Sequence, residues 1–198
     1  MIPYSPPLMI ATAGAVLGLR PNEEQRRALA HGFVQGTGRT RARRWDAAFV
    51  HHLGYWSHFD QRSGCSSWPL PATTSCHDLA RFARRERILS AHPPQPGELF
   101  LLWGPRRKAF VRTGIVIGVE PAEPRLDGSL QYECHTIEGN LTGTGRLDGN
   151  RMGRVSRFLS PAVGDRTIRW TDVQTLETRP RLRMTSALRD YNERTRAA

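Results

Sequence analysis

The stretch Arg44-Trp45-Asp46-Ala47-Ala48-Phe49-Val50-His51-His52-Leu53-Gly54 decides the fold, because its pattern is typical of the start of a buried helix. Phe49, Val50 and Leu53 supply apolar side chains to a core, and two alanines allow a neighbouring segment to approach closely. Asp46 stands in the first turn, where free backbone N–H groups and the helix dipole favour a negative charge. The same place would lower the pKa of a cysteine. On residue type alone, a capping carboxylate is the favoured interpretation of Asp46.

Two further elements are expected before this stretch. The opening, to about Leu19, predicts a helix or an apolar arm packed on the domain. Proline and two acids in Pro21-Asn22-Glu23-Glu24 are typical of a helix start. That helix is predicted to end near Val34, with a buried face made of Ala28, Leu29, Phe33 and Val34.

After the stretch, the aromatic and turn-rich segment Gly54–Thr74 predicts an ordered loop. Ser75 then caps a predicted helix over Cys76–Leu89. The solvated side of that helix is expected to carry four arginines: Arg81, Arg84, Arg85 and Arg87.

From Pro93 the periodicity changes to that of strands. The expected strands are residues 97–103, 109–119, 130–139, 151–158 and 166–170. Helices first and strands later predict an α+β fold, with N-terminal helices followed by a small antiparallel sheet. Three parts of the chain are expected: an N-terminal helical arm over residues 1–44, a domain over 45–172 and a basic C-terminal extension over 173–198.

The composition fits one well-cored domain of 198 residues with a net charge of +11. Almost all of the positive charge is arginine, with Lys108 the only lysine, and the basic residues are spread along the chain. Such a charge predicts non-specific attraction to polyanions. No aromatic RNA-binding motif, zinc-finger spacing or recognition helix accompanies it, so nucleic-acid binding is the weakest functional interpretation.

Three cysteines, Cys65, Cys76 and Cys134, are too few and odd in number for a disulfide scaffold, and buried free thiols are expected. Cys76-His77 and Cys134-His135 have the right residue types for a metal, but no C-x-x-C or H-x-x-x-H spacing supports them. No metal or cofactor is therefore expected.

The apolar stretch Pro7–Leu19 follows no lysine or arginine, and it is too short to span a bilayer. The sequence predicts a cytoplasmic chain without membrane insertion, and any export would need another route.

Four segments carry a resemblance to a known family. They are W-D-A-A-F-V at 45–50, P-G-E-L-F-L at 96–101, R-T-G-I-V-I-G-V at 112–119 and T-I-E-G-N at 136–140. Their order and spacing resemble those of the CHAP amidohydrolase/peptidase superfamily, a papain-like group that cuts peptidoglycan amide bonds. The resemblance runs from about Trp45 to Trp170 and implies a papain-like fold for the domain.

The chain departs from this family at the two positions that matter most for catalysis. Asp46 stands where the family has its nucleophilic cysteine, and Arg112 stands where it has its catalytic histidine, two residues before G-I-V. The third polar member of the site, which orients the histidine, corresponds to Glu138 or Asn140. The resemblance therefore implies a site at Asp46, Arg112, Glu138 and Asn140 that keeps its orienting group but lacks the Cys–His pair.

Asp46 and Arg112 carry the same charges as the thiolate and the imidazolium that they replace in the family's site. We expect Asp46 and Arg112 to form a carboxylate–guanidinium bridge, with Glu138 as the second partner of Arg112. Arginine cannot transfer a proton near neutral pH. The sequence thus predicts a pseudoenzyme that binds a peptide, a peptidoglycan fragment or a protein partner through an inherited groove.

An active cell-wall amidase or peptidase with a non-standard site is the alternative. It would need one of the histidines at 51, 52, 58, 92 and 135 close to Asp46. Cys65 and Cys134 lack the helix-start context that would make either of them a relocated nucleophile. The aromatic residues Trp56, Trp68 and Trp103 could line a groove, although a core role is at least as well supported for each.

Overall fold

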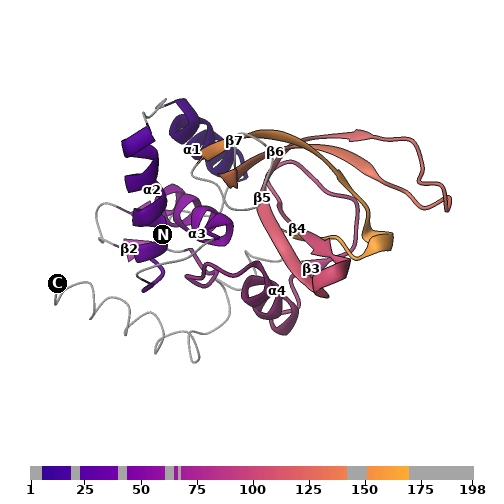
Figure 1. Cartoon of the computed structure of the whole chain (residues 1–198), viewed down its shortest axis with the longest axis horizontal. Helices are drawn as coiled ribbons and strands as arrows, with labels where there is room; N and C mark the ends of the chain where they lie inside the picture. Colours follow the sequence, from indigo (N-terminus) through magenta and orange to yellow (C-terminus); the bar gives the residue numbers. More distant parts are fainter. Residues whose placement is uncertain are drawn as a thin grey trace.

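The computed structural model describes residues 6–18, 23–39, 44–60, 65–66, 68–141 and 151–169. Helices precede a six-stranded antiparallel sheet, which confirms the α+β prediction (Figure 1). The expected C-terminal extension, 173–198, lies outside the described residues. The helices are α1 (Pro6–Gly18), α2 (Glu23–Gln35), α3 (Asp46–Ser57) and α4 (Cys76–Arg85).

The sheet has the strand order β3-β8-β4-β5-β6-β7, and each neighbouring pair is antiparallel. Its strands are β3 (Leu89–Ser90), β4 (Leu99–Gly104), β5 (Ala109–Pro121), β6 (Tyr132–Leu141), β7 (Arg151–Leu159) and β8 (Arg166–Ile168). A separate two-stranded sheet joins β1 (Phe59–Asp60) to β2 (Cys65–Ser66), where the sequence predicted only a loop.

Helix α4 is shorter than predicted. The Oγ of Ser75 accepts a hydrogen bond from the Asp78 backbone N–H at 3.1 Å, so the predicted cap is confirmed. The helix ends at Arg85, and Arg87 adopts a positive φ of 61°, which turns the chain. Leu89, predicted as the end of this helix, instead forms strand β3 with Ser90 and pairs with β8.

The core lies on both faces of the sheet. Helix α3 packs on β5 and β6, and α1 and α2 pack on α3 (Figure 1). On this side the buried side chains include Phe49, Leu53 and Ile115. Because side chains alternate along a strand, the other face buries a second cluster made of Phe100, Val116, Cys134 and Leu159.

The N-terminal segment joins the main core through α1, whose Met9, Ala13 and Val16 are buried, as expected for an apolar helix packed on the domain. In α2, Phe33 and Val34 are buried as predicted. Ala28 is exposed, so its predicted place on the buried face was wrong. Within the described ranges, none of the helices has the length and apolar character needed to cross a membrane.

Helix α3 approaches β6 so closely that only glycine fits at the contact. A Cβ atom at Gly139 would lie 2.6 Å from the ring of Trp45 and 2.8 Å from Phe49. Real side chains do not tolerate such distances, so a larger residue at this point would push the helix from the sheet. The glycine of T-I-E-G-N therefore positions the start of α3, and Asp46 with it, against the sheet.

Candidate functional site

Asp46 lies at the start of α3 and is almost fully buried, with 1% of its surface exposed. Its Oδ2 accepts hydrogen bonds from the Thr113 backbone N–H at 3.3 Å and from the Cys76 thiol at 3.2 Å. Its Oδ1 has no hydrogen-bond partner among the described residues. The side chain does not serve as the N-cap of its own helix, a position occupied by Trp45. Asp46 therefore links α3 to β5 and α4.

Burial dominates the ionisation of this pair. The pKa of Asp46 is raised by burial, and the charge of Arg112 and the hydrogen bonds to the carboxylate offset only part of the rise. Burial and the neighbouring Asp46 carboxylate raise the pKa of the Cys76 thiol well above its usual range. Cys76 therefore remains protonated, and in that form it donates its hydrogen bond to Asp46.

Cys76 was not among the site residues predicted from the sequence, although the sequence held a signal for it. It follows the capping Ser75 directly, at a helix start of the kind that can lower the pKa of a thiol. In the structure this thiol is buried, and desolvation outweighs the helix-start effect.

Arg112 is also almost fully buried, with 1% of its surface exposed. Its Nη1 donates to the backbone carbonyls of Gly139 at 3.2 Å and Asn140 at 3.3 Å. The same nitrogen lies 3.7 Å from Oε2 of Glu138. Its Nη2 finds no hydrogen-bond partner in the described part of the chain. Asn140 contributes a carbonyl from a left-handed backbone conformation, with a φ of 59°.

Glu138 is fully buried, and its closest partner is Arg157 on β7. Arg157 donates from Nε to Oε1 at 2.7 Å and from Nη2 to Oε2 at 2.8 Å, a bidentate pair. The Thr136 hydroxyl adds a third hydrogen bond at 2.9 Å. The bonds to Glu138 raise the pKa of Arg157. Arg157 was not predicted from the sequence, because nothing in its local pattern distinguishes it from the other arginines of the strand.

The structure brings the four predicted positions together but differs from the expected direct bridge between Asp46 and Arg112. Among the described residues, no nitrogen of Arg112 lies within 4.0 Å of an Asp46 oxygen. The two groups interact through space, since the Arg112 charge lowers the Asp46 pKa. The guanidinium is instead held by the carbonyls of β6 and by Glu138. We refer to Asp46, Cys76, Arg112, Glu138 and Arg157 as the polar cluster.

Among the described residues, none of the histidines considered for a rescued catalytic site is hydrogen-bonded to Asp46, whose donors are Thr113 and Cys76. A ring nitrogen of His52 lies 3.0 Å from the Ala48 carbonyl, and one of His58 lies 2.8 Å from that of Gly54. His51 is half-buried, and burial together with the neighbouring His52 lowers its pKa to about 3. His135 and His92 are exposed or half-exposed, and His135 lies 3.4 Å from Glu120.

The remaining candidates lie outside the polar cluster. Burial raises the pKa of Cys134 to about 12, and this thiol belongs to the second apolar cluster. The side chain of Cys65 lies outside the described residues. Among the described residues, no three His, Cys, Asp or Glu side chains form a group that could hold a metal ion. The three tryptophans, Trp56, Trp68 and Trp103, pack on different neighbours, and Trp56 is 46% exposed.

Comparisons of the chain with protein-family models, with curated proteins and with solved structures found no match. What the polar cluster can do follows from its chemistry. It holds two buried carboxylates, the buried guanidinium of Arg112, the partly exposed guanidinium of Arg157 and a protonated thiol. Guanidinium groups do not readily give up their protons. The polar cluster is therefore well suited to holding strands and helices together and poorly suited to proton transfer.

Proposed function

We propose that this chain is a catalytically inactive, CHAP-like domain of papain-like fold that binds a peptide, a peptidoglycan fragment or a protein partner. One observation carries the proposal. The positions that correspond to the nucleophile and the base of that family hold Asp46 and Arg112, and both side chains are buried within one polar cluster.

The chemistry of these groups supports a non-catalytic role. Amide hydrolysis by this route needs a nucleophile that forms an acyl intermediate and a base that takes up and returns a proton. A carboxylate is a poor nucleophile toward an amide, and a guanidinium group has no acceptor site for a proton. The Cys76 thiol is beside Asp46, but its raised pKa keeps it protonated.

The second candidate is an active amidase or peptidase with a non-standard site. The contact between Cys76 and Asp46 favours it, because a thiol lies 3.2 Å from a carboxylate that could accept its proton. In that mechanism Cys76 would attack the amide carbon, and Asp46 would return the proton to the leaving amine. The high pKa of the thiol and its burial both weigh against this reaction.

Turnover of defined peptidoglycan fragments by the purified full chain separates the two candidates. We expect no turnover by the parent or by Cys76→Ser, and a gain of turnover in the double variant Asp46→Cys with Arg112→His. Thermal unfolding establishes that each variant is folded. Turnover by the parent that is lost in Cys76→Ser would support the enzyme. Absence of any gain in a folded double variant would count against the CHAP-like assignment.

The binding role needs its own measurement. Calorimetric titration of the parent with muropeptides tests the peptidoglycan form of the proposal directly. Saturable binding without turnover is the expected result. Lack of binding would leave peptide or protein partners as the only ligands consistent with the proposal.

A further inference from the structure

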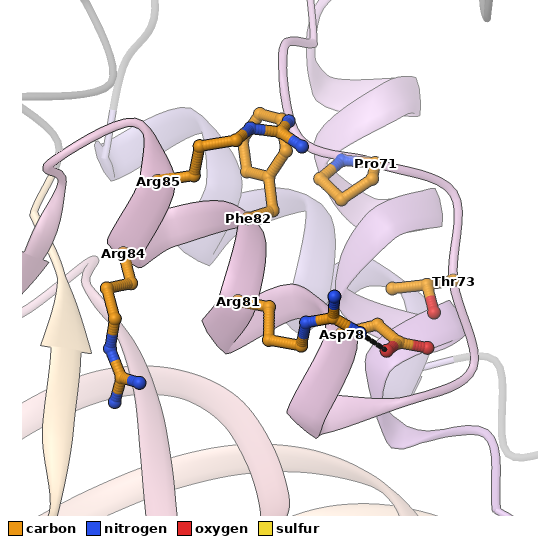
Figure 2. Close-up of a pocket in the computed structure, with 7 residues that line it drawn as sticks. All are labelled: Pro71, Thr73, Asp78, Arg81, Phe82, Arg84 and Arg85. Carbon is orange, nitrogen blue, oxygen red and sulfur yellow. Dashed lines mark ion pairs between the residues drawn. The ribbon is translucent and has the colours of Figure 1, made fainter.

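A surface pocket of about 610 Å³ lies on the outer side of α4 (Figure 2). It is formed between the helix and the segment that leads into it, and it opens to solvent. Cys76 and Leu79, which are buried, occupy the inner side of the same helix. The residues that line the pocket are Pro71, Thr73, Asp78, Arg81, Phe82, Arg84 and Arg85.

The lining carries an excess of positive charge. Arg81, Arg84 and Arg85 follow one another at helical spacing and are all exposed, and Asp78 is the only acid among the lining residues. The pair between Arg81 and Asp78 is 3.9 Å long and solvated on both sides, so it holds Arg81 weakly. Arg84 makes no ion pair within the described part of the chain. The guanidinium groups of Arg81 and Arg84 are therefore available to an anionic ligand.

The pocket also has an apolar part, made of Pro71 and Phe82 (Figure 2). The guanidinium of Arg85 lies over the Phe82 ring, 5.2 Å from its centroid, and its Nε is held by Glu86 at 2.8 Å. A ring covered in this way offers less of its surface for stacking by a nucleobase. The combination suits an aliphatic side chain placed beside carboxylates better than it suits a nucleic acid.

The directions of the arginines indicate an extended ligand. In Figure 2, Arg81 extends toward Asp78, Arg85 lies beside Phe82, and Arg84 extends away from both. One small anion therefore does not meet all three. A peptide with several carboxylates can meet them in turn, and each Arg–carboxylate contact can be bidentate.

We propose that the outer face of α4 binds an acidic peptide segment of a partner protein, with an apolar side chain of that segment placed against Pro71 and Phe82. The net charge of +11 favours the approach of such a segment from solution. This binding does not depend on the polar cluster or on the fate of any catalytic activity.

Fluorescence anisotropy with the full chain tests the proposal. The probe is a labelled peptide, Glu-Glu-Leu-Glu-Glu, measured at near-physiological salt, and a labelled oligothymidine of equal charge is the comparison. The test variant is Arg81→Gln/Arg84→Gln/Arg85→Gln. The matched control is Arg106→Gln/Arg107→Gln/Arg151→Gln, which removes the same charge from three exposed positions elsewhere.

We expect the α4 variant to raise the Kd for the peptide about tenfold or more, and the control to change it by less than about threefold. Equal weakening in both variants would overturn the proposal, because net charge alone would then explain the binding. Tighter binding of the oligothymidine than of the peptide by the parent would overturn it as well, as would failure of the parent to bind the peptide. Circular dichroism of each variant confirms that α4 is retained.

Discussion

Arg112 and Arg84 are the same residue type in opposite settings. Arg112 is buried beside Glu138 and is fixed by two backbone carbonyls. Arg84 lies on the outer face of α4, where it is exposed and makes no ion pair with a described residue. The first arginine is committed to holding β5 to β6, and the second is available to meet a ligand. Burial, rather than charge, distinguishes the role of Arg112 from that of Arg84.

The comparison also separates two kinds of carboxylate. Glu138 accepts a bidentate pair from Arg157 in a buried setting, where each charge depends on the other. Asp78 has a long, solvated contact with Arg81. Replacement of single groups should therefore have very different effects in the polar cluster and on α4.

Glu138→Gln should give the largest effect. The substitution leaves Arg112 buried and removes the ionic partner of Arg157, which should lower the free energy of unfolding by about 3–5 kcal/mol. Urea denaturation followed by circular dichroism measures it. The matched control is Glu120→Gln, an exposed acid on β5, which should leave the urea midpoint almost unchanged. An equally small change in the urea midpoint of both variants would contradict the distinction between the buried and the exposed carboxylate.

Gly139→Ala tests the contact that places Asp46 against the sheet. The added methyl group meets Trp45 and Phe49, so we expect a loss of about 1–3 kcal/mol in the free energy of unfolding. Gly14→Ala in α1 is the control, because no atom of the described residues lies within 4 Å of the place its methyl group would take. That change should stabilise the protein by about 0.5–1 kcal/mol. If Gly14→Ala destabilised the protein and Gly139→Ala did not, the packing described for α3 against β6 would be contradicted.

Acid should weaken the α3 side of the molecule. The pKa of His51 is lowered from 6.5 to about 3 in the fold, so the neutral ring is favoured there. The contribution of the neutral His51 ring to the free energy of unfolding is complete when the pH is above the pKa of His51 in the unfolded chain. It is lost as the pH falls from 6.5 toward 3, by up to about 1.4 kcal/mol per pH unit.

Urea unfolding at about pH 7 and about pH 5 measures this loss. His51→Gln should reduce the difference between the two conditions, whereas His77→Gln, on the exposed side of α4, should retain it. If the His51 variant retained the full difference in stability between the two pH values, groups other than His51 would be responsible for the pH dependence.

Arg84→Gln should have the smallest effect on stability, within about 0.5 kcal/mol, because its side chain is exposed and has no described partner to lose. Thermal or urea unfolding measures it alongside Glu138→Gln. A loss as large as that of the Glu138 variant would remove the distinction between the two regions.

The sequence was sufficient for the order of the four helices and of the five strands from β4 to β8, whereas the short strands β1, β2 and β3 were not predicted. The resemblance of the segments that hold Asp46, Arg112 and Glu138 to those of a known family implied a shared site, and in the structure these residues belong to the polar cluster. Alternation of apolar residues predicted β4, β5 and β6 to within a few residues. These features depend on local periodicity, which a sequence displays directly.

The partners within the cluster were harder to predict, because they depend on tertiary contacts. Arg157 reaches Glu138 across β6 and β7, and Cys76 reaches Asp46 from another helix. The turn at Arg87 was missed because an arginine rarely adopts a positive φ. Strand β3 was missed as a consequence, since the helix was expected to continue into it.

The position of Arg157 along the chain has a consequence for biosynthesis. Glu138 emerges from the ribosome before β7, so for a time the nascent chain contains this acid without its closest partner. The domain cannot bury Glu138 in a bidentate pair until β7 has been synthesised and has docked on β6. Nascent chains that stop before residue 157 would carry an acid that resists burial, and they would be exposed to proteases and chaperones. Synthesis of β7 thus sets the earliest moment at which Glu138 can be buried with its closest partner, and β8, which pairs with β3 and β4, follows it.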